Sequence, residues 1–84
     1  MAEFSVGQIV KSRQGKDAGQ VYVVSGVDAD RVKVINPPKY NTTHPKAKNP
    51  KHLQTTHGQA SEIALRLEAG QDIDAGEFHR SVVS

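Results

Sequence analysis

The pattern of apolar and polar residues predicts three strands in the first part of the chain. Residues 31–35 alternate basic with β-branched side chains, so one face would be buried and the other would meet solvent or a ligand. Residues 7–13 read as an earlier strand, which ends at a glycine-containing loop, and residues 20–27 as the next. Because residues 21–24 are mostly apolar without alternation, the second strand is expected to be central, with both faces covered.

Prolines define the next segment. Residues 36–50 contain all four prolines of the chain, which discourage both helix interiors and central strands, so we expect a long basic loop there. Residues 51–54 are then long enough for one short closing strand. About five short antiparallel strands in a chain of 84 residues predict a mainly β, single-domain fold, a small antiparallel barrel.

After about Gly58 the pattern changes to that of short helices. Ser61 is expected to cap a helix of about two turns that stops at Gly70, and Asp72 to cap a second one. Such short helices are marginal unless they dock, so we expect this tail either to pack on the barrel or to fray. The second helix would present an apolar stripe made of Ile73, Phe78 and Val82.

Charge divides the chain at the same place. Residues 1–57 hold nine Lys and Arg against four Asp and Glu, whereas residues 58–84 hold two against five. No acidic residue occurs between Asp30 and Glu62, and a stretch of this kind suits contact with a polyphosphate. We therefore expect a basic barrel over residues 1–57 and an acidic, partly helical or flexible tail over residues 58–84.

Several classes of function receive no support from the sequence. Without cysteine there is no disulfide framework and no thiolate metal site, and the spacing of His44, His52 and His57 fits no zinc motif. Residues 15–19 lack the Gly-Lys-Ser/Thr ending of a P-loop, and no nucleophile elbow is present. The acidic N-terminus and the lack of a long apolar run predict neither a signal peptide nor a membrane span. We expect a cytoplasmic protein that is not an enzyme and uses no metal or cofactor.

Two blocks of the sequence resemble a KOW domain. They are residues 6–19, Val-Gly-Gln-Ile-Val-Lys-Ser-Arg-Gln-Gly-Lys-Asp-Ala-Gly, and residues 45–54, Pro-Lys-Ala-Lys-Asn-Pro-Lys-His-Leu-Gln. Together they are similar to small bacterial KOW-domain RNA-binding proteins, which are related to a KOW-containing large-subunit ribosomal protein family of archaea and eukaryotes. The resemblance implies an SH3-like barrel that binds structured RNA or the ribosome without catalysis. It covers neither the loop over residues 36–44 nor the tail after Thr56.

The residues themselves indicate how such binding would work. Lys and Arg at strand ends can pair with phosphates, and glycine-rich loops let backbone N–H groups approach them. Among the flat side chains, Tyr40 and His52 lie beside the basic run and could stack on bases, whereas Tyr22 is expected in the core. The candidate RNA-binding residues are Arg13, Gly15, Lys16, Lys39, Tyr40, Lys46, Lys48, Lys51 and His52.

The sequence therefore predicts an RNA-binding accessory protein of the translation machinery, associated with structured or ribosomal RNA through its basic loop. The alternative is a protein-interaction adaptor in which the barrel or the tail binds a partner protein, because SH3-like barrels serve both purposes. The opposite charges of the two halves allow a third hypothesis, in which the tail folds back over the basic body and competes with RNA.

Overall fold

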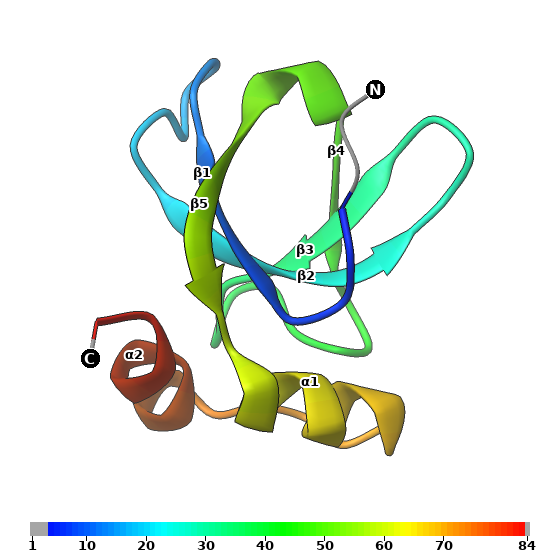
Figure 1. The fold of residues 1–84 in the computed structure, drawn as a ribbon, viewed down its shortest axis with the longest axis vertical. Coiled ribbons are helices and arrows are strands. Elements are labelled where there is room, and N and C mark those ends of the chain that lie inside the picture. The colour runs from blue at the N-terminus through cyan, green and yellow to red at the C-terminus, as the bar shows by residue number, and fades with distance from the viewer. Residues whose placement is uncertain (1–3, 84) are drawn as a thin grey trace.

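The computed structural model describes residues 4–83, except the side chains at positions 57 and 83. Within this range the chain forms one antiparallel sheet of five strands in the order β4-β3-β2-β1-β5. The strands are β1 (Gln8–Ser12), β2 (Val21–Val27), β3 (Val32–Ile35), β4 (Lys46–Lys48) and β5 (Leu53–Gln59). The sheet curls into a barrel-like domain, and the helices α1 (Ser61–Glu68) and α2 (Ala75–Val83) lie at one end of it (Figure 1). The predicted fold class, mainly β with about five antiparallel strands and a helical C-terminal tail, is confirmed.

The central strand β2 is buried on both faces, which explains its unbroken apolar run. Because side chains alternate along a strand, Tyr22 and Val24 belong to one core, and Val23 between them belongs to another. The predictions that this strand is central and that Tyr22 is a core residue are confirmed. The inner core, which the curled sheet encloses, consists of Val10, Tyr22, Val24, Val32, Val34 and Leu53.

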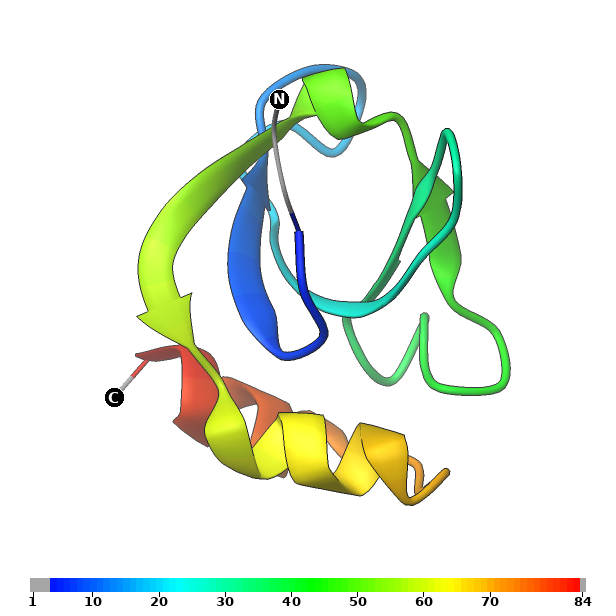
Figure 2. The same ribbon diagram turned by 45° about the vertical axis from the view of Figure 1, so that its right-hand side comes forward.

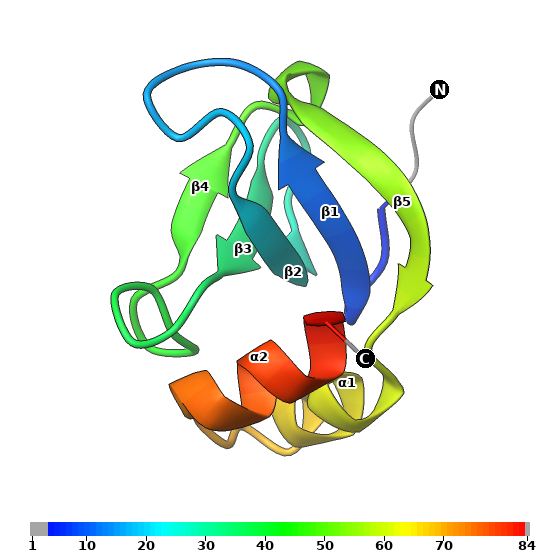
Figure 3. The same cartoon turned by 90° about the vertical axis from the view of Figure 1, so that its left-hand side faces the viewer.

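The two helices lie against one end of the barrel, where they pack on side chains of the outer face of the sheet (Figures 2 and 3). Ile63 of α1 and Phe78 of α2 are buried against Val23 and Ile35 of the sheet, so barrel and tail share a second core. Of the two outcomes expected for the tail, packing is the one observed. The boundary expected at residue 57 falls inside β5, which continues to Gln59 before α1 begins.

Residues 36–50 contain a strand, so the prediction of a loop throughout this segment was wrong. β4 pairs with β3, and Lys48 lies opposite Val32 in the ladder. Because Pro45 and Pro50 flank the three residues of β4 rather than lying within them, they remove no donor from the ladder. β4 also lies at the edge of the sheet, where only one side of a strand must be paired.

The closing strand is displaced from the predicted residues 51–54. A short 3₁₀ helix, η1 (Pro50–His52), occupies the first part of that segment. Proline suits the first turn of a helix, and the side-chain oxygen of Asn49 accepts a hydrogen bond from the backbone N–H of Lys51 at 2.9 Å. β5 starts only after this turn and extends to Gln59, well beyond the predicted end.

Both predicted helices form, but their caps differ from the expected ones. Ser61 is the first residue of α1, and Ala60 precedes it without a side-chain cap. α2 is capped by Asp74 instead of Asp72, and the Asp74 carboxylate accepts a hydrogen bond from the backbone N–H of Glu77 at 2.7 Å. No helix in the described part of the chain is long and apolar enough to cross a membrane. The expected apolar stripe packs on the barrel through Ile73, Phe78 and Val82.

A substitution in α1 tests whether the tail is part of the fold. Ile63 is fully buried in the second core, so Ile63→Ala should lower the free energy of unfolding by about 3 kcal/mol. Leu65 lies on the same helix with 68% exposure, and Leu65→Ala should change it by less than about 0.5 kcal/mol. Urea unfolding followed by circular dichroism measures both. Equal midpoints for the two variants would mean that the tail contributes nothing to the core.

Candidate nucleic-acid interface

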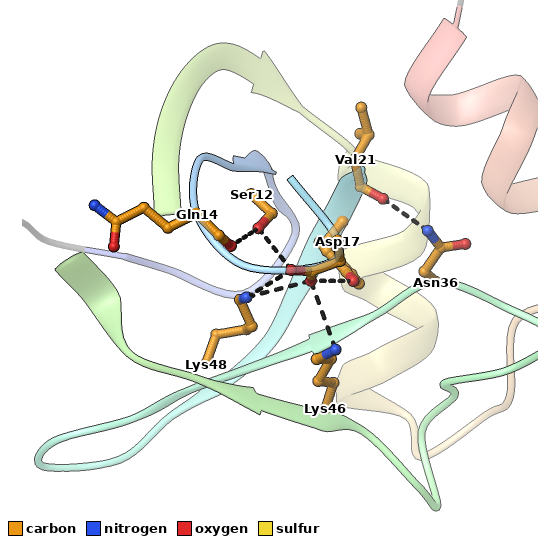
Figure 4. A network of polar contacts seen from close by, with 8 residues as sticks. Ser12, Gln14, Asp17, Val21, Asn36, Lys46 and Lys48 are labelled. Carbon is orange, nitrogen blue, oxygen red and sulfur yellow. Dashed lines mark hydrogen bonds and ion pairs between the residues drawn. The ribbon is translucent and has the colours of Figure 1, made fainter. Parts of the chain in front are cut away.

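The carboxylate of Asp17 holds the loop between β1 and β2 in place (Figure 4). It accepts hydrogen bonds from the Tyr22 hydroxyl at 2.6 Å and from the Ser12 hydroxyl at 3.0 Å. The ammonium of Lys48 donates to both carboxylate oxygens, at 3.1 and 3.2 Å. A single side chain in the loop therefore connects β1, β2 and the edge strand β4.

These contacts keep Asp17 ionised. Burial alone would raise the pKa of Asp17, but the hydrogen bonds from Tyr22, Lys48 and Ser12 outweigh it and hold that pKa well below its ordinary value. Burial, together with the hydrogen bond to Asp17, raises the pKa of Tyr22. At neutral pH the carboxylate is therefore charged and the phenol is protonated, which is the combination that the hydrogen bonds require.

Two of the predicted RNA-binding lysines point toward this carboxylate. The side chain of Lys48 is only 9% exposed and its ammonium is held by Asp17, so it does not belong to the exposed basic surface. The Lys46 side chain is 30% exposed, and its ammonium lies 3.6 Å from the same carboxylate. Figure 4 shows both side chains converging on Asp17 from β4. Lys48 thus has a structural role in holding the loop, whereas Lys46 is partly exposed beside the same carboxylate.

The β1–β2 loop and η1 lie at the end of the barrel opposite the helices (Figure 3), and the chain there carries three exposed cations. Arg13 follows β1, Lys16 lies in the loop held by Asp17, and Lys51 lies in η1. The backbone N–H of Arg13 donates to the carbonyl of His52 at 2.9 Å, which joins the loop to η1. Within residues 4–83 none of the three cations forms an ion pair with a carboxylate. We call Arg13, Lys16, Lys51 and the half-buried His52 the loop–η1 surface.

Gly15 shapes the loop that carries Lys16. Its φ of 92° lies in the left-handed region that glycine tolerates best, and its carbonyl accepts a hydrogen bond from the backbone N–H of Ala18 at 3.2 Å. This is the role of a turn residue. Gly15 is exposed, so its backbone is also accessible to a ligand of the loop.

Lys39 and Tyr40 lie in the segment between β3 and β4, outside the loop–η1 surface. The ammonium groups of Lys39 and Lys46 lie 5.5 and 5.1 Å from the centre of the Tyr40 ring. Asn36 and Tyr40 exchange backbone hydrogen bonds, which close the short turn that contains Lys39. We call the adjoining hollow, of about 320 Å³, the Tyr40 hollow. It is lined by Asp17, Gln20, Tyr22, Asn36, Pro37, Pro38, Lys39, Tyr40 and Lys46.

The acidic tail does not cover these basic groups. Its buried apolar residues pack against the sheet, and its polar contacts to the barrel include hydrogen bonds from Asn41 to the Ile73 carbonyl at 2.6 Å and from Thr42 to the Gln71 carbonyl at 3.0 Å. Among the ion pairs of residues 4–83, none joins a tail carboxylate to a barrel cation. The hypothesis of a tail folded over the basic end therefore finds no support in this arrangement.

Sequence reasoning missed Asp17, the residue around which the site is organised. The available signal was a lone acid between Gly15 and Gly19, in a part of the chain where bases outnumber acids. Its partner Lys48 is 31 positions away, so no local pattern connects the two. For metal binding, the described side chains contain no group of three His, Asp or Glu that could hold an ion.

Removing the charge of Asp17 should destabilise the fold. Asp17→Asn leaves the buried Lys48 ammonium without its anion, and we expect a loss of about 3 kcal/mol in the free energy of unfolding. Asp28→Asn is the matched control, because the side chains of the Lys33–Asp28 pair are 47% and 57% exposed and the pair should contribute less than about 1 kcal/mol. Urea unfolding measures both. Adding Lys48→Met to Asp17→Asn should restore part of the loss, and no recovery would contradict the assignment.

The same network predicts a pH dependence. The folded pKa of Asp17 is lowered relative to an unfolded value of about 4, so its stabilising effect is complete above about pH 5 and is lost as the pH falls toward the folded pKa. The difference in Tm between wild type and Asp17→Asn should therefore be constant from neutral pH to about pH 5 and shrink below about pH 4. Thermal melts over this range test it, and a difference that does not change with pH would contradict it.

Comparison with known proteins adds no family to this description. No family model matches the chain, and the search of curated proteins finds no match. The KOW resemblance thus stays a prediction from the sequence. The candidate site therefore consists of three parts: the contacts of Asp17 with Ser12, Tyr22 and Lys48, the loop–η1 surface, and the Tyr40 hollow.

Proposed function

We propose that this protein is a non-enzymatic RNA-binding module that contacts the phosphate backbone of structured RNA through the loop–η1 surface. The observation that carries the proposal is the position of Arg13, Lys16 and Lys51, exposed and without ion pairs within residues 4–83, at the end of the barrel away from the acidic helices. Cations that no carboxylate neutralises are the groups that can exchange their counterions for phosphates.

The segments that carry these cations are fixed before any ligand binds. The loop is tied to the barrel by Asp17, and η1 is capped by Asn49, with the Arg13–His52 backbone hydrogen bond between the two. Contacts to phosphates fix the register and orientation of a nucleic acid. A rigid platform reduces the conformational entropy that is lost on binding, which favours the use of these residues for recognition.

The arrangement of the two KOW-like blocks also supports the proposal. Residues 6–19 and residues 45–54 are far apart in the sequence, yet the Asp17–Lys48 ion pair and the Arg13–His52 hydrogen bond join them. The residues that carry the resemblance thus form one contiguous part of the molecule. The resemblance implies association with ribosomal RNA and the translation machinery, and on that ground we place the protein in the cytoplasm, bound to the ribosome or to structured RNA.

The adaptor alternative has less support from the tail. Ile63, Ile73 and Phe78 are buried in the core shared with the barrel and cannot at the same time bind a partner protein. The exposed Leu65 is the large apolar side chain that the described part of the tail still offers. A single exposed leucine is ordinary for a protein surface.

Salt dependence tests RNA binding directly. With about three phosphate contacts, from Arg13, Lys16 and Lys51, the slope of log affinity against log salt for a labelled RNA hairpin with a single-stranded tail should be near about −2. Lys16→Gln should flatten this slope by about 0.7, and the combined change of Arg13, Lys16 and Lys51 to Gln by about 2. Fluorescence anisotropy across a series of KCl concentrations measures it.

Arg66→Gln provides the charge-matched control. It also removes one positive charge, but Arg66 lies on α1 and pairs with Glu77 at 2.9 Å, at the opposite end of the molecule. Its slope should equal that of the wild type. A wild-type slope near zero would overturn the proposed function, and equal slopes for Lys16→Gln and Arg66→Gln would remove the loop–η1 surface from it.

A further inference from the structure

The Tyr40 hollow is a site that the loop–η1 surface does not explain. Its walls combine the aromatic ring of Tyr40 and the apolar rings of Pro37 and Pro38 with the polar groups of Gln20 and Asn36. Its volume of about 320 Å³ is at the small end of the range of ligand pockets, about 300–1,000 Å³. A hollow of this size suits one flat ring system and not an extended cofactor.

The cations beside the hollow select an anionic ligand. Lys39 and Lys46 both lie next to the Tyr40 ring, and Lys39 is exposed without an ion pair within residues 4–83. The nearby carboxylate of Asp17 is already occupied by Tyr22, Ser12 and two lysines. An aromatic ring with two ammonium groups over it matches a nucleotide, because the phosphates can pair with the ammonium groups while the planar base takes their place against the ring.

The hollow adjoins the loop that carries Lys16 of the loop–η1 surface. Asp17 lines the hollow, and Lys16 immediately precedes Asp17 in the sequence. Polar groups remain for the edge of a base, because Asn36 donates its amide N–H to the Val21 carbonyl at 3.0 Å and keeps its side-chain oxygen available. One RNA strand could therefore contact Lys16 and also occupy the Tyr40 hollow.

We propose that the Tyr40 hollow holds one unpaired nucleotide of the bound RNA, with its base against the Tyr40 ring and its phosphates beside Lys39 and Lys46. This inference rests on the proposed function and adds the class of substrate. A base inside a duplex is stacked and paired and cannot enter such a hollow, so the protein selects RNA with unpaired nucleotides over continuous duplex. This preference for unpaired nucleotides depends on the Tyr40 ring, against which the base stacks.

The test compares one labelled RNA as a single strand and annealed to its complement. Wild type should bind the single strand more tightly than the duplex. Tyr40→Leu should weaken binding of the single strand about tenfold and leave duplex binding unchanged, because only the single strand loses a stacking contact. Tyr40→Phe keeps the ring and should behave as wild type. Because Tyr40 also packs against the inner core, thermal melts establish that each variant is folded at the assay temperature.

A second measurement locates the base that enters the hollow. In a set of single strands that each carry one 2-aminopurine, wild-type protein should quench the fluorescence at the position that enters the hollow, and Tyr40→Leu should abolish the quenching. If single strand and duplex bind equally with a steep salt slope, or if no position is quenched, the hollow inference fails and the proposed function stands. If neither RNA binds with a salt-dependent affinity, the proposed function fails as well. Binding of a proline-rich peptide that depends on Tyr40, without RNA binding, would overturn both.

Discussion

The ion pair between Asp17 and Lys48 is the constraint on which the basic end of this protein depends. It joins a loop residue to the edge strand, and through the Tyr22 hydroxyl it reaches the inner core. Without it the loop with Lys16 would keep the hydrogen bonds from Ser12 and Tyr22 to Asp17 and backbone bonds such as the one from Gly19 to the Ser12 carbonyl at 2.8 Å, but it would lose its side-chain link from Asp17 to the edge strand β4. The buried ion pair thereby helps to set the position of the loop that carries the exposed Lys16.

A second constraint follows from the size of the chain. A sheet of five short strands encloses only a small inner core, and a domain of this length buries a limited share of its surface. The helices add a second core on the outer face, built on Val23 and Ile35. Because this core lies at the end away from the loop–η1 surface, the acidic tail stabilises the barrel without placing its charges beside the basic groups.

The sequence predicted those elements of the fold that are determined by residues close together in the chain. The first three strands follow from alternation and from glycine turns, and the central place of β2 follows from its apolar run. β4 was not predictable in this way, because its three residues become a strand only by pairing with β3. The burial of Lys48 depends in the same way on a distant partner: a lysine between Ala47 and Asn49 looks exposed until Asp17 is placed beside it. For the candidate site, Arg13, Lys16 and Lys51 are exposed, as their residue types indicate, whereas Lys48 is buried, which its residue type does not indicate.

The position of Lys48 also affects how readily the edge strand β4 could pair with a strand of another chain. Edge strands offer unpaired backbone groups to other chains, and proteins blunt them with short length and with charges that point inward. β4 has both properties, since it spans three residues and its last side chain enters the barrel to reach Asp17. A strand of another chain could form backbone hydrogen bonds with the free edge of β4. It would supply no second carboxylate to pair with a buried ammonium such as that of Lys48. The contact that orders the loop thus also makes one edge of the sheet a poor template for the growth of aggregates.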